Sequence, residues 1–318
     1  MVLHVLEVST WYARDMKNLG LVYAFLAYFI WGMAPLFWRL MEHVPSLEIV
    51  AHRMVWSALM VIIVIIVMGQ WKQFRELLSS TRTLIRLLFA SLLISANWGV
   101  YIWAINNNYI VEASMGYFIN PLLNIVLGVL IFKEKLRLNQ WLAVCLAFFG
   151  VAYLIIIHGQ IPWIALMLAF SFGGYAAVKK TIGVPATHGL AVESGLVVLP
   201  ALACLFYLST QNQLEFGHDL STDALLISGG AFTLIPLLLF SAAAKRLSFT
   251  VLGMTQYLGP TLQLLIGVFV FHEGFGTERQ ISFGLIWLGL LFYSIDQLNH
   301  RRKRKVAEGT AGVVIKAE

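Results

Sequence analysis

The sequence has little charge and almost no cysteine. Only 12% of its 318 residues are charged, well below the roughly 25% typical of soluble domains, whereas 59% are apolar and the mean hydropathy is +0.80. A water-soluble fold is therefore excluded. The two cysteines, Cys145 and Cys204, lie in apolar runs without CxxC or Cys/His spacing, so neither a disulfide framework nor a zinc site is indicated.

Motifs of common catalytic sites are also missing. The sequence contains no HExxH metal motif, no GxSxG nucleophile elbow and no GxxxxGK[ST] phosphate loop. We therefore expect neither an enzyme nor an ATP-driven pump, and no cofactor or metal. The net charge of +6 comes from basic residues in short loops between apolar runs, a pattern of membrane topology rather than of nucleic-acid binding. The expected partners are membrane lipids and a small-molecule substrate.

Long apolar runs are what the sequence does contain. A bilayer core of about 30 Å needs about 20 apolar residues in a helix. Ten runs of this kind predict an all-α integral membrane protein with ten transmembrane helices at 19–38, 47–68, 84–105, 111–132, 138–157, 162–178, 189–208, 224–244, 250–271 and 281–298.

The basic residues predict the orientation. With a cytoplasmic N-terminus, nineteen of the 22 Lys and Arg residues fall on the inner side, Arg39 and Arg279 on the outer side and Arg53 within the second span. Both termini are therefore expected in the cytoplasm, which agrees with an even number of spans.

An internal repeat divides the chain. Residues 112–150 superpose without a gap on residues 251–289, and nine of these 39 positions are identical. The identical pairs include Pro121 and Pro260, Gly128 and Gly267, Phe132 and Phe271, Glu134 and Glu273, and Gly150 and Gly289. Five spans in each copy force the copies into opposite orientations, so we predict two inverted-topology five-helix repeats, an architecture of secondary transporters. A duplicated scaffold that moves nothing is the alternative.

The repeat gives a domain plan. Residues 1–16 are expected to form a disordered leader or to precede the true start, 17–158 the first repeat and 159–298 the second. Residues 299–318 form a basic cytoplasmic tail that is expected to be disordered, and its Arg and Lys run fits a membrane anchor.

Polar side chains on the repeated spans predict a substrate path. Tyr117, Asn120 and Asn124 are spaced i, i+3 and i+7 and share a helix face. Their repeat-mates are Gln256, Gly259 and Gln263, so the same face is polar in the second copy, where the candidates are Gln256, Tyr257 and Gln263. Pro121 and Pro260 are expected to free a backbone carbonyl one turn earlier in each copy. Hydrogen bonding that only holds the helices together is the alternative.

Three ionisable residues lie inside predicted spans. His52 and Arg53 lie in the second span and Glu193 in the seventh, at positions where a charge is costly and therefore informative. Arg53 either attracts an anionic group or holds a gate, and Glu193 either carries a coupling proton or is a structural partner. Trp98 and Tyr101, spaced i and i+3 in the third span, are the aromatic side chains expected to line a cavity.

Four stretches resemble a known family. AYFIWGMAPLFWRL (27–40), EIVAHRMVWS (48–57), NWGVYIWAINN (97–107) and EASMGYFINPLLNIVLG (112–128) are similar to the RarD family of EamA-type permeases in the drug/metabolite transporter superfamily. The resemblance runs from Lys17 to Asn299. It implies two five-helix repeats, a bacterial inner (plasma) membrane location and export of small molecules without ATP hydrolysis, and it carries no substrate-site residues.

The predicted function is a secondary transporter of small metabolites or drugs that works by alternating access, driven by a proton or substrate gradient. A lipid scramblase or a non-transporting membrane scaffold remains the alternative, because a polar helix face also suits lipid headgroups.

Overall fold

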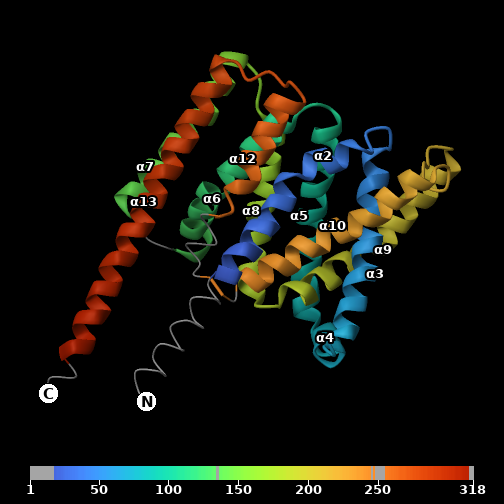
Figure 1. Cartoon of the computed structure of the whole chain (residues 1–318), viewed down its shortest axis with the longest axis horizontal. Coiled ribbons are helices and arrows are strands. Elements are labelled where there is room, and N and C mark those ends of the chain that lie inside the picture. Colours follow the sequence, from blue (N-terminus) through green and yellow to red (C-terminus); the bar gives the residue numbers. More distant parts are fainter. Residues whose placement is uncertain (1–17, 134–135, 245, 248–254, 315–318) are drawn as a thin grey trace. The chain divides into compact units, whose positions relative to one another are not determined.

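Helices are the regular elements of the computed structural model, which describes residues 18–133, 136–244, 246–247 and 255–314 (Figure 1). The predicted leader, 1–16, lies outside these residues. The helices are α2 (Ala34–Arg39), α3 (Ser46–Val67), α4 (Trp71–Leu78), α5 (Thr81–Asn106), α6 (Ile110–Phe132), α7 (Leu138–His158), α8 (Trp163–Ile182), α9 (Ala186–Thr210), α10 (Leu220–Ala244), α12 (Leu258–Leu265), the π-helical turn η1 (Ile266–Val270) and α13 (Thr277–Val314).

Seven helices within the described ranges are long and apolar enough to cross a membrane. They are Asn18–Arg39, Ser46–Val67, Thr81–Asn106, Ile110–Ile131, Leu138–Ile157, Ala186–Thr210 and Leu220–Ala244. The other three predicted spans overlap α8, α12 with η1, and α13, and the apolar stretches of the first two are shorter. The chain is thus an all-helical multi-pass membrane protein, and the number of ten spans stays a prediction.

Large apolar side chains are exposed along these helices. Examples with more than two thirds of the side chain uncovered are Val67, Leu130, Ile156 and Phe206. Isolated exposed apolar residues are ordinary in soluble proteins, but long exposed apolar surfaces are not. A lipid environment explains this surface, because lipid tails impose no cost on it.

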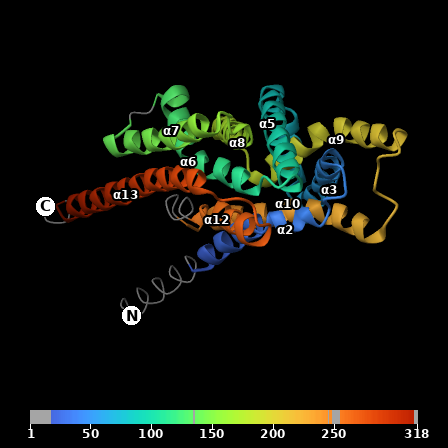
Figure 2. The ribbon, with the colours of Figure 1, turned by 90° about the horizontal axis from the view of Figure 1, so that it is seen from above.

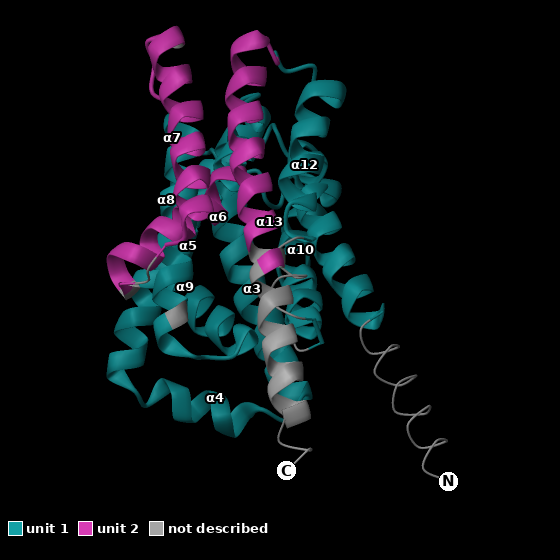
Figure 3. Cartoon of the chain, turned by 90° about the vertical axis from the view of Figure 1, so that its left-hand side faces the viewer, with its two compact units in different colours: residues 1–117, 163–274 teal, residues 118–162, 275–318 magenta. Residues whose placement is uncertain are grey.

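The chain forms two compact units (Figure 3). The first comprises residues 1–117 and 163–274, and in it α3 packs against α9 and α10 while α5 packs against α8. Its core includes the fully buried side chains of Trp38, Ile49, Ile102 and Ile105.

The second unit comprises residues 118–162 and 275–318. In it α7 and α13 run side by side (Figure 2). A methyl group on Gly150 would lie 2.9 Å from the carbonyl oxygen of Ser282, and one on Gly289 would lie 2.7 Å from that of Ala143. Small residues therefore let the two backbones approach closely, as in many membrane helix pairs.

Backbone conformation follows the sequence repeat at one further pair. Lys133 and His272 are repeat-mates, and both have a left-handed φ of 54°. Each follows a helix, α6 and η1 respectively, at a position where a left-handed residue commonly ends a helix. The two copies therefore share a left-handed residue at this end of the span, although the first ends as an α-helix and the second as a π-helical turn.

The ninth predicted span differs from the expectation. Residues 250–271 were predicted to form one helix interrupted by Pro260, but in the described part Pro260 is the third residue of α12. Backbone N–H groups in a first turn have no acceptor within the helix, so Pro260 removes no helix-interior hydrogen bond there. Pro121, in contrast, lies inside α6 as predicted.

The C-terminal tail also differs. Residues from Asn299 onward were expected to be disordered, but α13 continues to Val314. Extending an existing helix avoids the cost of nucleation, and Arg, Lys, Ala and Glu are good helix formers.

Candidate functional site

An arginine is buried within the first unit. Arg53 is the eighth residue of α3 and is 7% exposed. Its Nε donates a hydrogen bond of 2.7 Å to Thr233 Oγ1 on α10. Its Cζ atom lies 4.0 Å from the ring centroid of Trp98 and 5.1 Å from that of Trp38. Cation–π contacts of this kind stabilise a desolvated guanidinium by about 2 kcal/mol.

Two tyrosines complete this cluster. Tyr101 on α5 and Tyr117 on α6 both interact electrostatically with Arg53, and their rings meet edge to face with centroids 5.5 Å apart. We call Trp38, Arg53, Trp98, Tyr101, Tyr117 and Thr233 the arginine cluster. It draws side chains from α2, α3, α5, α6 and α10, so tertiary packing assembles it from distant parts of the sequence.

A buried asparagine fixes the α5 side of the cluster. Asn97 Nδ2 donates to the Leu168 carbonyl oxygen and to Ser171 Oγ, both at 3.0 Å, and its Oδ1 accepts from the Tyr117 hydroxyl at 3.3 Å. These bonds join α5, α6 and α8. Buried amides with this many partners hold neighbouring helices in register.

A second charged cluster surrounds Glu193 on α9. Its carboxylate, 3% exposed, accepts hydrogen bonds from Lys179 Nζ at 2.6 Å and from the Tyr175 hydroxyl at 3.1 Å. Lys179 and Tyr175 lie on α8, so an ion pair joins the two helices. Breaking such a pair leaves a buried charge without a partner.

A third cluster lies near the start of α3. Glu48 is fully buried and accepts hydrogen bonds from the backbone N–H groups of Glu215 and Phe216, at 2.9 to 3.1 Å. The His52 ring lies against that of Phe216 with centroids 4.5 Å apart and planes tilted by 30°, and it accepts a hydrogen bond from Trp56 Nε1 at 3.2 Å. Glu48 and His52 therefore hold the connection between α9 and α10 against α3.

The predicted amides are distributed more widely. Gln263 on α12 is buried and donates to the Trp31 carbonyl oxygen at 3.1 Å. Gln256 and Tyr257 are partly exposed in the turn before α12. Asn120 and Asn124 belong to the second unit, where Asn120 is buried and Asn124 exposed.

Of the predicted site residues, the structure thus brings Arg53, Trp98, Tyr101 and Tyr117 together. Sequence reasoning missed Trp38, Thr233, Lys179 and Tyr175. Thr233 carries no charge and gives no signal in an apolar run. Lys179 directly follows the predicted sixth span, which ends at residue 178, whereas helix α8 continues through it. Its spacing from Tyr175, i to i+4, was the one available signal.

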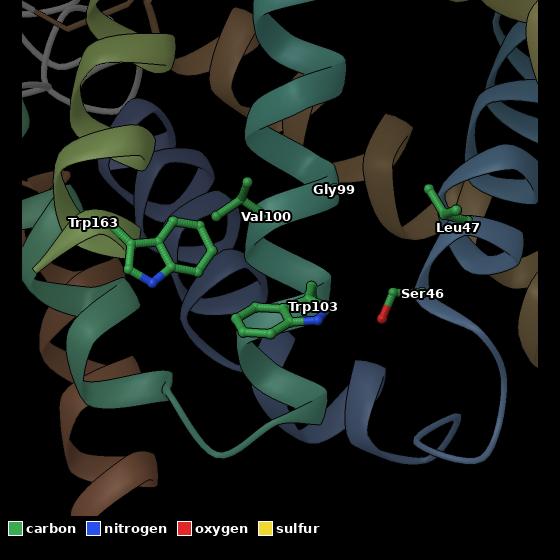
Figure 4. Close-up of a pocket in the computed structure, with 6 residues that line it drawn as sticks. All are labelled: Ser46, Leu47, Gly99, Val100, Trp103 and Trp163. Atoms are coloured by element: carbon green, nitrogen blue, oxygen red, sulfur yellow. The ribbon is translucent and has the colours of Figure 1, made fainter.

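A surface pocket of about 320 Å³ lies beside α5 (Figure 4). It is lined by Ser46, Leu47, Gly99, Val100, Trp103 and Trp163. At 100° per residue, Gly99, Val100 and Trp103 point away from the face of α5 that carries Trp98 and Tyr101. None of the six side chains is ionisable, so this pocket offers no group for a charged ligand.

No group of three or more His, Cys, Asp or Glu side chains in the described ranges is arranged to hold a metal ion.

Comparison with known proteins decides the family. The sequence profile of the EamA-like transporter family matches residues 18–156. Protein RarD from Streptomyces exfoliatus is 43% identical over 305 residues, which cover 95% of this chain and 97% of the relative. The chain belongs to the RarD family of EamA-like transporters.

Further comparisons agree with this membership. An uncharacterized transporter, YojE, from Bacillus subtilis (strain 168) is 42% identical to this RarD-family protein over 289 residues, covering 90% of this chain and 97% of the relative. The crystal structure of another protein is similar to this chain, with a TM-score of 0.55 and 17% sequence identity. The similarity covers 87% of this chain and 97% of that protein's chain. That likeness shows a shared fold. The family and the relatives' names identify this RarD-family protein as a membrane transporter rather than an enzyme.

Proposed function

We propose that this protein is a secondary transporter that exports small metabolites or drugs across the inner membrane of a bacterium by alternating access, and that its substrate binds at the arginine cluster. The observation that carries this proposal is the burial of Arg53 among polar and aromatic side chains from four other helices. A charge inside a membrane bundle is expensive, and such residues mark substrate and ion pathways.

The sequence repeat supports alternating access. Gly150 and Gly289 are repeat-mates that pack reciprocally, and Lys133 and His272 are repeat-mates with the same left-handed backbone. Two copies with matching local structure suit a transporter in which one half rocks against the other around a central site.

We further propose that Glu193 carries a coupling proton. Protonation would remove the charge that attracts Lys179 and would open the contact between α8 and α9. In proteoliposomes we expect Glu193→Gln to transport down a substrate gradient and to lose its response to an imposed pH gradient. A Gln variant that still responds fully to the pH gradient would contradict this role.

The test of transport compares metabolites inside and outside a bacterial strain that lacks its own copy of the gene. The strain carries the wild type, Trp98→Leu or Trp103→Leu. Trp103 is the matched control because it lies on the other face of α5. We expect a compound that leaves the cell with the wild type and with Trp103→Leu, and about tenfold less with Trp98→Leu, since a cation–π contact contributes about 1–2 kcal/mol.

Two results would redirect this proposal. Equal export by the wild type and Trp98→Leu would move the site away from the arginine cluster. The absence of any difference from the empty strain, also under drug challenge, would favour a lipid scramblase or a scaffold. A measurement of labelled-lipid transfer between the leaflets of proteoliposomes would then distinguish a scramblase, which transfers the lipid, from a scaffold, which does not.

A further inference from the structure

We propose that the substrate is an amphiphilic anion, whose carboxylate, phosphate or sulfonate binds the guanidinium of Arg53 and the hydroxyl of Tyr101 while its apolar part lies against Trp98 and Tyr117. This inference rests on the proposed transport function and names its substrate class.

The charge of Arg53 has no counterion among the described residues. Its one hydrogen bond there is the one from Nε to Thr233, and no carboxylate in those ranges lies within the 4.0 Å of an ion pair. The indoles of Trp98 and Trp38 stabilise a cation but are neutral. Buried charges are generally paired, so a ligand that supplies the negative charge completes this site.

Carboxylates on α3 and on α9, the helix that packs against α3, are engaged elsewhere. α3 and α9 both begin after a proline, Pro45 and Pro185, and Arg53 and Glu193 each follow their proline by eight residues. Glu193, in the matching position of the packed helix, is held by Lys179 and Tyr175. Glu48, on α3 itself, accepts backbone N–H groups of the α9–α10 connection. Neither carboxylate is available to neutralise Arg53.

A second polar group in the cluster lacks a partner. Tyr101 is 5% exposed, and its hydroxyl has no hydrogen-bond partner in the described part of the chain. Tyr101 follows Trp98 by three residues on α5, so it shares the face of α5 on which the Trp98 ring contacts Arg53. A buried donor without an acceptor destabilises the fold, a penalty that an anionic acceptor would remove.

The arrangement of hydrogen-bond donors and aromatic rings around Arg53 favours an anion with a flat or apolar body. Nε of Arg53 donates its hydrogen bond to Thr233, so both terminal nitrogens remain for a bidentate contact with a carboxylate or phosphate. The Thr233 hydroxyl is itself engaged with the Gly229 carbonyl oxygen at 3.0 Å, and the Tyr117 hydroxyl with Asn97. The remaining surroundings are aromatic faces and edges, which bind apolar groups.

The test is ligand-dependent thermal stability of the full-length protein in lipid nanodiscs. The probes are 3-phenylpropionate, phenyl phosphate and benzenesulfonate, with 3-phenylpropionamide as the neutral analogue and 3-phenylpropylamine as the cationic one. A ligand that binds only the folded state raises the unfolding midpoint in a concentration-dependent way. We expect at least one anion to raise it, and neither the amide nor the amine.

Variants assign the effect to the cluster. Arg53→Gln should weaken anion binding about 30-fold or more, since truncating one partner of a buried charge pair costs at least 2 kcal/mol. Tyr101→Phe, which preserves the ring, should weaken it about tenfold. Arg39→Gln is the matched control, because Arg39 already pairs with Glu42 at 2.6 Å, and it should bind as the wild type does. Arg53→Lys keeps the charge and tests the same site if the Gln variant fails to fold.

Three outcomes would overturn the anion inference: stabilisation by the amide equal to that by the carboxylate, unchanged binding in Arg53→Lys and Tyr101→Phe, or no response to any of the three anions. If only neutral compounds were exported, the transport function would be supported and the proposal of an anionic substrate would be rejected. Anion binding without export of any compound would support the site and reject the transport function.

Discussion

Gly150 and Gly289, which the sequence repeat pairs with one another, pack reciprocally in the structure: Gly150 on α7 meets the backbone of Ser282 on α13, and Gly289 on α13 meets that of Ala143 on α7. Ala143 and Ser282 are themselves 139 residues apart, the same offset as the glycines. Such a reciprocal arrangement is that of a two-fold axis between antiparallel helices, which supports the prediction of an inverted repeat.

The α7–α13 contact predicts opposite effects for two glycines of one helix. Gly289→Ala should destabilise the protein by about 1–3 kcal/mol, because its methyl group would overlap the Ala143 carbonyl oxygen. Gly284→Ala is the control: nothing lies within 4 Å of its added methyl, and Ala favours helix over Gly by up to about 1 kcal/mol. Thermal unfolding in detergent measures both. Equal midpoints for the two variants would contradict the packing.

Glu273 is predicted to stabilise the start of α6. Its carboxylate accepts the backbone N–H groups of Ile110 at 2.6 Å and of Val111 at 2.8 Å, where the helix dipole also favours a negative charge. Glu273→Gln should cost about 1.5–3 kcal/mol, the range for hydrogen bonds to charged groups. The exposed Glu76→Gln serves as control in the same unfolding measurement, and a loss no larger than the control's would argue against the cap.

The Glu193–Lys179 pair predicts non-additive substitutions. Lys179→Met should cost roughly 2–3 kcal/mol because it leaves the Glu193 carboxylate buried and unpaired, somewhat below the value for fully buried pairs since Lys179 is 20% exposed. Adding Glu193→Leu should recover part of that loss. A double-mutant cycle by thermal unfolding measures the coupling, and simple additivity would mean that the pair contributes no coupling energy.

Asp219 predicts a pH dependence outside the membrane spans. Hydrogen bonds from the Ser221 hydroxyl and from the Thr222 backbone and hydroxyl groups lower the pKa of its carboxyl from 3.8 to about 2. Because the folded-state pKa is depressed, the stabilisation is present above pH 3.8 and is lost as the pH falls through 2. Unfolding midpoints of the wild type and Asp219→Ala should therefore differ at pH 6 and converge as the pH falls below 2. A difference as large below pH 2 as at pH 6 would assign the effect to another group.

The distribution of basic residues predicts the side of the membrane on which the C-terminus lies. With both termini cytoplasmic, a green fluorescent protein fused after Glu318 should fluoresce in a bacterial host, and an alkaline phosphatase fused there should be inactive. The reverse pattern would require an odd number of spans or the opposite orientation.

Much of the architecture was predictable from local sequence. Length and hydropathy of an apolar run depend on neighbouring residues alone, and each of the predicted ranges overlaps a helix of the described chain. The positions at which helices begin and end were less predictable. Helix α13 runs past the basic tail, and α12 begins close to Pro260, because helix ends depend on capping and on chain continuation as well as on hydropathy.

The solvent, the helical class and the presence of costly charges at His52, Arg53 and Glu193 all follow from residue types and their positions in apolar runs. The groups that these charges contact depend on how the helices pack. Lys179 reaches Glu193 from α8, whereas Arg53 meets Thr233, 180 residues later, and the faces of two indoles. Contacts between residues so distant in sequence depend on how the helices pack. Local sequence periodicity does not encode that packing.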